Sequence, residues 1–213
     1  TATFETILSK LKIDALNEMQ QASIETISAN NNVMLLSSTG SGKTLAFLLP
    51  ILQLLDPVKK NTQAIIIVPS RELALQIETV FKCISTSFTV TCCYGGHLRE
   101  TEENTLNQAP ALLIGTPGRL ADHIRRGNIT IDSIETLVLD EFDKSLELGF
   151  VDEMSFIIGS LKSLKKRILT SATEAVEIPD FIGLADDAVK LNFLDSKNEK
   201  SAVTLANHSK KSM

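Results

Sequence analysis

The sequence predicts an α/β fold in which a mostly parallel central sheet is covered by helices on both faces. From residue 32 to about residue 191, short runs rich in Val, Ile and Leu alternate with longer stretches that have helical spacing. The short runs lack polar alternation, as expected for strands that are buried on both faces. Because 43% of the 213 residues are hydrophobic and 22% are charged, the chain can bury one substantial core.

Each expected element follows from this alternation. The apolar runs predict strands at 33–36, 64–68, 89–93, 111–114, 136–139, 167–170 and 188–191. The connecting stretches predict helices at 43–55, 71–85, 98–107, 118–126, 150–161 and 178–184, and a further helical region precedes them at 4–11 and 16–29. We therefore expect three parts: a helical segment at 1–31, the sheet domain at 32–195, and a linker or disordered tail at 196–213, where the composition turns polar without periodicity.

Charge and composition exclude some functions. The net charge of −5 argues against a protein that coats nucleic acid by bulk electrostatics, so any such contact must be local. The longest apolar runs are far shorter than the roughly 20 residues that cross a bilayer, so we expect no membrane segment. The cysteines are too few for a disulfide framework, which favours a reducing, cytoplasmic setting. Cys92 and Cys93 are expected to fill a strand, with a redox pair as the alternative.

A glycine-rich loop follows the first expected strand and leads directly into a helix. Its residues are Ser37, Ser38, Thr39, Gly40, Ser41, Gly42, Lys43 and Thr44. The glycines let backbone N–H groups converge on a phosphate at the start of the helix. Lys43 can neutralise the β and γ phosphates, and the Thr44 hydroxyl can ligate Mg²⁺. Gly-Ser-Gly runs also form plain turns, but a turn does not need Lys-Thr opening an apolar helix, so the pattern predicts an ATP and magnesium site.

Two acids follow the expected strand at 136–139. Asp140 is placed to hold Mg²⁺ directly or through water, and Glu141 can orient and deprotonate the attacking water. Adjacent acids after a strand also occur as helix caps and first-turn charges. Together with the phosphate loop, the catalytic interpretation is favoured, and Lys43, Asp140 and Glu141 are the candidate catalytic residues.

With these residues the chain resembles the DEAD-box RNA helicases, specifically their first RecA-like domain. Asp140-Glu141-Phe142-Asp143 stands where the family reads Asp-Glu-Ala-Asp. In family order, the other matching strings are Pro69-Ser70-Arg71-Glu72-Leu73-Ala74, Gly95-Gly96, Thr116-Pro117-Gly118-Arg119-Leu120 and Ser171-Ala172-Thr173. Upstream, Phe4 and Gln20 resemble the aromatic residue and the glutamine that recognise adenine in this family. The resemblance covers nearly the whole chain and implies a RecA-like P-loop fold.

The resemblance also implies roles for these residues. Gln20 would bind the adenine edge while Phe4 packs on the ring; the alternative for Gln20 is a solvated helix residue. Asp143, Ser171 and Thr173 would couple the nucleotide state to a neighbouring domain, with Ser171 and Thr173 bonding Asp140, Asp143 or both; a helix cap is the alternative. Backbone contacts to RNA would come from Pro69, Ser70, Arg71, Gly95, Gly96, Thr116, Pro117, Gly118 and Arg119. Alone, the two glycines would indicate a turn and Arg119 a helix-surface charge.

Three departures from the family pattern stand out. Leu16-Asn17 replaces the common Pro-Thr before the glutamine, which weakens the expectation of adenine selectivity. Ser37 takes the place of the usual first glycine of the phosphate loop, where the family often has alanine. Phe142 replaces alanine between the acids, and we expect its side chain to turn away from the metal.

The function implied is that of the ATP- and RNA-binding first domain of an ATP-dependent RNA helicase. A second RecA-like domain of the same polypeptide would supply arginines at the γ-phosphate, and about forty residues after Ser171 leave no room for it. We therefore expect a monomeric fragment that binds nucleotide, hydrolyses it very slowly and does not unwind duplexes alone. The alternatives are a P-loop phosphotransferase or GTPase, for which no acceptor lid or guanine motif is found, and an ATP-gated RNA clamp or assembly scaffold without unwinding.

Overall fold

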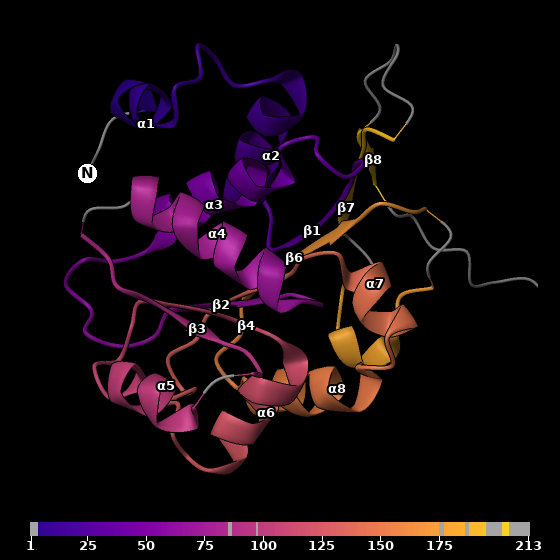
Figure 1. Ribbon diagram of the computed structural model, residues 1–213. Helices are drawn as coiled ribbons and strands as arrows, with labels where there is room; N and C mark the ends of the chain where they lie inside the picture. The colour runs from indigo at the N-terminus through magenta and orange to yellow at the C-terminus, as the bar shows by residue number, and fades with distance from the viewer. Residues whose placement is uncertain are drawn as a thin grey trace, which may run out of the picture.

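A computed structural model of the chain describes residues 4–84, 87–96, 98–174, 177–185, 188–194 and 202–204. It forms one eight-stranded sheet between two layers of helices (Figure 1). The expected α/β fold with a mostly parallel sheet is therefore confirmed. Of the stretch expected to be a linker or disordered tail, 196–213, only residues 202–204 are described, and residues 1–3 also lie outside the description.

Seven strands run parallel, in the order β3-β4-β2-β5-β6-β1-β7, and β8 pairs antiparallel with β7 at one edge. Each predicted strand is found within one residue at either end, because buried parallel strands are continuous apolar runs. The strands are β1 Asn32–Leu36, β2 Ala64–Ile67, β3 Val90–Cys93, β4 Leu112–Gly115, β5 Thr136–Leu139, β6 Lys166–Ser171, β7 Val189–Asn192 and β8 Ala202–Thr204.

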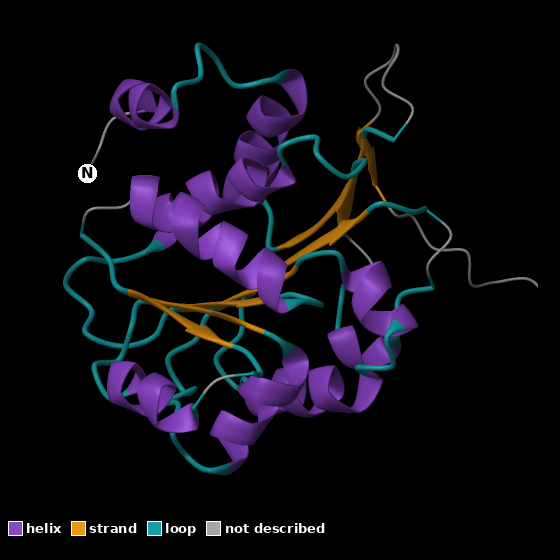
Figure 2. Ribbon diagram, viewed as in Figure 1, coloured by secondary structure: helices purple, strands orange, loops and turns teal. Residues whose placement is uncertain are grey.

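The helices are divided between the two faces of the sheet, as Figure 2 shows by the purple layers on either side of the orange strands. One layer comprises α1 Phe4–Leu11, α2 Glu18–Ala29, α3 Lys43–Leu54 and α4 Arg71–Ile84. The other comprises α5 Arg99–Leu106, α6 Pro117–Arg125, α7 Phe142–Glu147 and α8 Val151–Ser160, with the 3₁₀ turn η1 Asp180–Ile182 beside α8.

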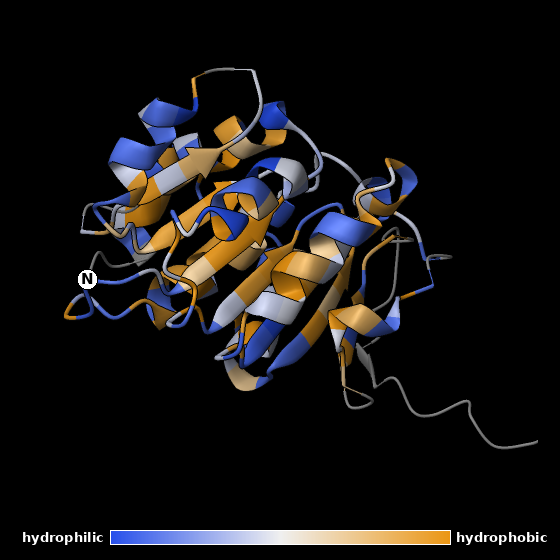
Figure 3. Ribbon diagram, turned by 90° about the horizontal axis from the view of Figure 1, so that it is seen from below, coloured by the Kyte–Doolittle hydropathy of each residue, from blue (hydrophilic) through white to orange (hydrophobic). Residues whose placement is uncertain are grey.

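The core has two halves, one under each helical layer. Successive residues of a strand point to opposite faces, so Ile66 of β2 packs with Phe47 and Phe81 under α3 and α4. Ile65 and Ile67 of the same strand pack into the half covered by α5 to α8. In Figure 3 the hydrophobic colour accordingly runs along the strands, whereas the helices carry both colours.

Three elements differ from the prediction, and one of them is strand β8, which pairs with β7 inside the stretch expected to be a linker or disordered tail. The helix expected at 178–184 is only the 3₁₀ turn η1, because Pro179 caps it on one side and Gly183, with φ of 64°, ends it on the other. Helix α7 was not predicted, since its six residues begin inside the acidic motif and are too few for a periodic signal.

The cysteines are all free thiols, and Cys92 and Cys93 of β3 lie on opposite sides of the sheet. The longest described helix, α4, has 14 residues, and no described helix is long and apolar enough to span a bilayer.

Candidate nucleotide-binding site

The candidate site residues that follow the strands meet at the carboxyl edge of the sheet and fall into two neighbouring groups. The loops after β1, β5 and β6, which are adjacent strands, carry the phosphate loop, the acids and Ser171-Ala172-Thr173. The loops after β3, β4 and β2, also adjacent, carry Gly95-Gly96 and the residues at 116–119 and 69–71. The strand register places the two groups side by side, because the Asp140 N–H after β5 donates to the carbonyl of Ile67, the last residue of β2, at 3.0 Å. Parallel strands thus bring together segments that are far apart in the sequence.

The phosphate loop curls between β1 and α3. Gly40 and Gly42 have φ of 77° and 91°, in the left-handed region that favours glycine. A Cβ at Gly42 would lie 2.5 Å from Gln20 Nε2, so a side chain at this position would displace the Gln20 amide. Lys43 is the first residue of α3, so the loop presents the N-terminus of a 12-residue helix, where partial positive charge and unbonded N–H groups suit a phosphate.

Lys43 is folded back into this loop. Its side chain is 7% exposed, and Nζ donates to the carbonyls of Ser37 and Ser38, each at 2.7 Å. Burial lowers the pKa of Lys43, and the nearby Asp140 and Glu141 partly oppose that shift. The ammonium therefore stands close to the acids, within a curl of backbone that a phosphate would enter.

Ser37, where the resemblance places alanine or glycine, braces the loop. Its hydroxyl donates to Ser41 Oγ at 2.6 Å, and its N–H donates to the Ser171 carbonyl at 3.0 Å. The departure from the family pattern thus adds a hydrogen bond across the curl without obstructing it.

Asn17 and Gln20 connect α2 to the phosphate loop. They form a reciprocal cap, in which Asn17 Oδ1 accepts the Gln20 N–H at 2.8 Å and Gln20 Oε1 accepts the Asn17 N–H at 3.0 Å. Their amide nitrogens donate to the carbonyls of Ser41 and Gly42, at 3.1 and 3.2 Å respectively. Gln20 is only 6% exposed, so it is not a solvated helix residue. Phe4 begins α1, and its side chain lies outside the described residues.

Asp140 directly follows β5, and its carboxylate and the Lys43 ammonium attract each other electrostatically. Its carboxyl is 3% exposed, and burial raises its pKa to about 6, although the Thr170 hydroxyl that donates to Oδ1 favours the charged form. Glu141 is half-buried and has φ of 49°, a conformation that non-glycine residues rarely adopt. Its N–H donates to Thr170 Oγ1 at 3.0 Å. Backbone strain of this kind concentrates at functional sites.

Asp143 joins the acids to the segment after β6. Its Oδ2 accepts the Ala172 N–H at 3.2 Å and the Thr173 hydroxyl at 3.4 Å. Ser171 does not reach either acid; its hydroxyl donates to the Thr173 carbonyl at 2.8 Å. Asp143 Oδ1 is buried and has no hydrogen-bond partner among the described residues. An orphaned buried carboxylate oxygen beside a desolvated Asp140 is an environment that a bound divalent cation would stabilise.

On the other side of the sheet edge, Arg71 and Tyr94 approach each other. Ser70 caps α4 through its hydroxyl, which accepts the Leu73 N–H at 3.2 Å. The Arg71 guanidinium lies over the Tyr94 ring, 5.0 Å from its centroid. Gly96 is exposed next to this guanidinium, so Arg71 stands at an open surface beside the glycine pair.

The third loop of this group is held by an ion pair. Thr116 precedes α6, Pro117 opens the helix and Gly118 is exposed. Arg119 is not a solvated helix-surface charge: its side chain is 14% exposed, and Nε lies 3.6 Å from Oε2 of the buried Glu102. Sequence reasoning missed Glu102, because a glutamate in a polar helix normally indicates a solvated face.

The comparisons agree with this geometry. A protein-family model described as DEAD/DEAH box helicase matches residues 17–181. The chain belongs to the DEAD/DEAH box helicase family. Among solved structures it is similar to a DEAD box protein from Methanococcus jannaschii, with TM-score 0.77 and 25% identity over 89% of this chain and 53% of that one. It is also similar to a hypothetical ATP-dependent RNA helicase from Sulfolobus tokodaii, with TM-score 0.76 and 28% identity. That match covers 88% of this chain and 56% of the other. The fold is therefore that of a RecA-like domain.

Curated relatives in the DEAD/DEAH box helicase family are similar over part of their length. The chain is 35% identical to the ATP-dependent RNA helicase DeaD of Haemophilus influenzae over 169 residues, which are 78% of this chain and 28% of that protein. It is 37% identical to the ATP-dependent RNA helicase CshA of Limosilactobacillus reuteri over 179 residues, 82% of this chain and 36% of that protein. The chain thus spans about a third of the length of these relatives.

Proposed function

We propose that the chain is the ATP- and RNA-binding first domain of an ATP-dependent RNA helicase, in which ATP hydrolysis is coupled to duplex unwinding or to remodelling of RNA–protein complexes. The observation that carries the proposal is the strand order. It sets the phosphate loop and the acids on β1, β5 and β6, directly beside three further loops on β2, β4 and β3 at the same sheet edge. The proposal extends to a monomeric, cytoplasmic protein with a second RecA-like domain in the same polypeptide.

Nucleotide binding is assigned to the phosphate loop and α2. The backbone N–H groups at 38–44 would surround the phosphates, and Lys43 would leave the two carbonyls that it now binds in order to reach the β and γ oxygens. Gln20 uses one amide hydrogen and one lone pair within the chain, so a donor and an acceptor are left for the adenine edge. Phe4 would pack on the adenine ring.

Thr44 and Asp140 would hold Mg²⁺, which would neutralise charge that develops on the phosphate oxygens. Their hydroxyl and carboxylate oxygens are the ligand types that this cation prefers. Glu141, turned by its left-handed backbone, would orient the attacking water and accept its proton. Asp143, through Thr173 and the Ala172 N–H, would pass the state of the nucleotide to the neighbouring domain.

RNA would lie across the loops at 69–71, 95–96 and 116–119. Exposed Gly95, Gly96 and Gly118 allow a sugar-phosphate chain to approach backbone N–H groups, and Arg71 offers a cation beside them. These groups recognise phosphate and sugar and carry little sequence information.

The first test is nucleotide binding by this chain, measured with a fluorescent ATP analogue and Mg²⁺. Lys43→Ala should weaken binding by about 10- to 100-fold, because charge-assisted bonds to phosphate are lost. Lys82→Ala, which removes a lysine of 61% exposure on α4, is the matched control and should bind as the unaltered chain does. Equal affinity of both folded variants would remove the basis for the phosphate site.

The second test distinguishes a motor from an ATP-gated RNA clamp or assembly scaffold. In the natural protein that contains this chain, Glu141→Gln should abolish ATP turnover while RNA is retained in the presence of ATP. If the protein is a clamp or scaffold without turnover, ATP turnover and RNA retention should differ little between the unaltered protein and Glu141→Gln. The 213-residue chain alone should hydrolyse ATP about 10³- to 10⁵-fold more slowly than the natural protein. This factor is the typical contribution of an arginine finger. Robust RNA-stimulated turnover by this chain alone would contradict the need for a second domain.

A further inference from the structure

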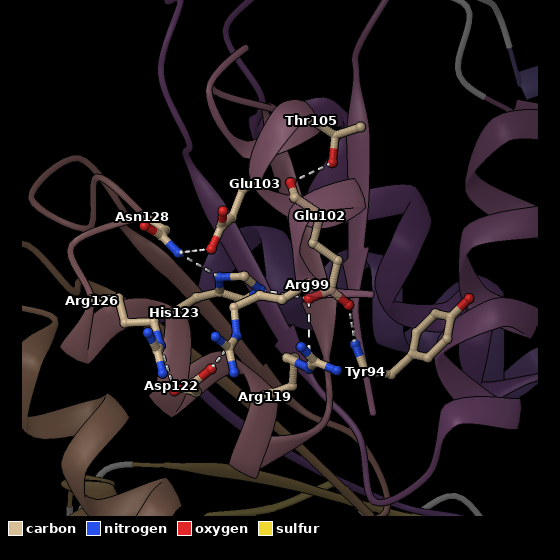
Figure 4. A network of polar contacts seen from close by, with 10 residues as sticks. All are labelled: Tyr94, Arg99, Glu102, Glu103, Thr105, Arg119, Asp122, His123, Arg126 and Asn128. Atoms are coloured by element: carbon tan, nitrogen blue, oxygen red, sulfur yellow. Dashed lines mark hydrogen bonds and ion pairs between the residues drawn. The ribbon is translucent and has the colours of Figure 1, made fainter. Parts of the chain in front are cut away.

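A buried polar cluster lies beneath the loops that follow β3 and β4 (Figure 4). At its centre is the carboxylate of Glu102, on α5, which is 2% exposed. Apolar residues of the same core half, among them Leu106 and Leu120, lie in the same layer. A carboxylate buried in such surroundings costs several kcal/mol unless hydrogen bonds and opposite charge compensate it. The partners of Glu102 are therefore essential to its position.

These partners come from both loops. Glu102 Oε1 accepts the backbone N–H of Tyr94 at 2.9 Å, immediately before Gly95-Gly96. Glu102 Oε2 lies 2.5 Å from His123 Nε2 and 3.6 Å from Arg119 Nε, both on α6. A single carboxylate thus connects the loop after β3 with the loop and helix that follow β4, as the dashed lines in Figure 4 show.

The ring of His123 fixes the direction of this carboxylate. His123 is fully buried, and Asn128 Nδ2 lies 3.1 Å from its Nδ1 and 3.0 Å from Glu103 Oε1. The Asn128 amide is oriented so that its Nδ2 donates to Glu103 Oε1 and to His123 Nδ1. His123 Nδ1 is therefore an acceptor. The ring proton then resides on Nε2 and is donated to Glu102 Oε2.

A metal ion offers a competing explanation for the same residues. The ligand atoms of Cys93, Glu102 and His123 all lie within 4.8 Å of one another, and all three residues are buried. However, two ligands of a tetrahedral zinc stand roughly 3.3 Å apart when each is about 2.0 Å from the metal. The 2.5 Å between His123 Nε2 and Glu102 Oε2 is a direct hydrogen bond. Burial also raises the pKa of the Cys93 thiol, and Arg119 adds a cation beside the carboxylate. The geometry therefore favours a hydrogen-bonded cluster.

We propose that Glu102 is a positioning residue of the RNA surface, which sets the spacing between the glycine pair after β3 and the start of α6. This inference rests on the proposed function and deepens it. Because the Arg119 guanidinium faces Glu102, its charge is already compensated inside the protein. Its role is then to hold the carboxylate, and phosphate binding falls to Arg71 and to the backbone N–H groups of the two loops. RNA with regularly spaced phosphates is bound well only when both loops keep their separation.

A second ion pair links the same two helices at their surface. Arg99 Nε of α5 lies 2.9 Å from Asp122 Oδ2 of α6, and the side chains are 39% and 33% exposed. This pair connects α5 and α6 but contacts neither loop, so it supplies a matched control.

The test uses the natural protein that contains this chain, with a uridine homopolymer as RNA. Glu102→Gln replaces one acceptor oxygen by an NH₂ group, which would face an N–H donor and leave Arg119 without its counter-charge. The RNA concentration that half-saturates ATP turnover should rise by about ten-fold, while the KM for ATP changes by less than about two-fold. Asp122→Asn removes the same charge from the surface pair and should leave both values unchanged.

A second variant keeps the test decisive if Glu102→Gln does not fold. Glu102→Asp retains the charge but draws the carboxylate back by one methylene, so that it cannot reach both Tyr94 and His123. It should raise the half-saturating RNA concentration by about three-fold. Amide exchange at Tyr94, followed in the 213-residue chain, should accelerate in any folded Glu102 variant and remain slow in Asp122→Asn.

The outcomes separate this inference from the proposed function. If RNA stimulates the unaltered protein but folded Glu102 variants match its half-saturating RNA concentration, Glu102 does not position the loops. If RNA does not stimulate the unaltered protein, the proposed function fails and this inference fails with it. Titration of the unaltered chain with Co²⁺ should give no thiolate–cobalt band, and a stoichiometric band that Glu102→Gln abolishes would overturn the inference by making Glu102 a metal ligand.

Discussion

The hydroxyl of Thr170 on β6 donates a hydrogen bond to Asp140 Oδ1 at the end of the neighbouring strand β5. The Thr170 hydroxyl oxygen itself accepts the Glu141 N–H at 3.0 Å. Thr170 is fully buried, so both bonds form away from competing water. One hydroxyl therefore fixes the carboxylate that is the candidate magnesium ligand and the backbone of the candidate general base.

Replacing Thr170 by valine preserves its shape and removes this hydroxyl. Thr170→Val should lower the free energy of unfolding by about 1–3 kcal/mol, because Asp140 Oδ1 and the Glu141 N–H both lose a partner. ATP turnover in the natural protein should fall as well, since Glu141 is no longer held. Urea unfolding and steady-state turnover measure the two effects. Ser28→Ala, at an exposed hydroxyl on α2, is the control and should change neither. Unaltered turnover in Thr170→Val would show that this bond does not position the acids.

The pH dependence of stability should reveal the buried Asp140. Burial raises its pKa from 3.8 to about 6, so between these values the folded chain holds a proton that the unfolded chain has released. This contribution to stability is complete below pH 3.8 and is lost as the pH rises through 6. Without nucleotide or metal, the free energy of unfolding of the chain should therefore fall by up to about 3 kcal/mol relative to that of Asp140→Asn as the pH rises from 3.8 to 6. Urea unfolding of both proteins from pH 4 to 7 gives the difference. A constant difference over that range would contradict the raised pKa.

Phe142 occupies the core instead of the catalytic surface. Its ring is 0% exposed and packs in the core half that α5 to α8 cover. Phe142→Ala restores the alanine of the family motif, but it should destabilise this chain by about 3–5 kcal/mol because a large cavity opens. Phe142→Leu should cost only about 1 kcal/mol, since most of the volume is kept. Urea unfolding of both variants tests the ordering. If Phe142→Ala were as stable as Phe142→Leu, the surroundings would have to collapse into the cavity.

The sheet could be predicted because its chemistry is local. A parallel strand covered on both faces must be apolar at every position, so Ala64–Ile67 and Thr136–Leu139 are recognisable without any partner. The phosphate loop is recognisable for the same reason, since Gly40, Gly42 and Lys43 act within one continuous segment. The short elements α7 and η1 could not be predicted in this way, because six or three residues do not establish a period.

The contacts between distant segments could not be predicted. Thr170 and Glu102 act through residues on neighbouring strands and helices, and nothing in their local sequence distinguishes them from an ordinary strand threonine or a solvated glutamate. In the sequence, Asn17 is recognisable only as a departure from the family pattern, whereas the structure makes it a cap and a contact of the phosphate loop. These roles depend on the strand order and on the packing of α2 and α5, which periodicity does not specify.

The two roles of Asn17 can be separated by substitution. Asn17→Thr keeps an oxygen for the Gln20 N–H but removes the amide that donates to the Ser41 carbonyl at 3.1 Å. Its unfolding free energy should stay within about 0.5 kcal/mol of the unaltered chain, whereas Asn17→Ala should lose about 1 kcal/mol with the cap. Both variants should bind the fluorescent ATP analogue more weakly, because the phosphate loop loses a tether. Equal stability of the two variants would indicate that the cap contributes nothing.

Gly115, the last residue of β4, should tolerate no side chain. An added Cβ would overlap the Cys93 carbonyl oxygen and lie 2.8 Å from Leu120 Cγ. Neither neighbour can move easily, because Cys93 is held in the adjacent strand and Leu120 is fully buried on α6. Gly115→Ala should therefore destabilise the chain by about 3 kcal/mol. Because Thr116 follows directly, the loop at 116–119 should shift and RNA affinity should fall as well.

Gly159→Ala is the matched control for Gly115→Ala. Gly159 is exposed on α8, and a Cβ there would meet nothing within 4 Å. Alanine restricts the unfolded chain more than glycine does and favours the helix. The free energy of unfolding of Gly159→Ala should therefore rise by about 0.5–1 kcal/mol. Urea unfolding should thus show shifts of opposite sign for the same chemical change. If both variants shifted in the same direction, helix propensity and close packing would not be the forces that distinguish the two glycines.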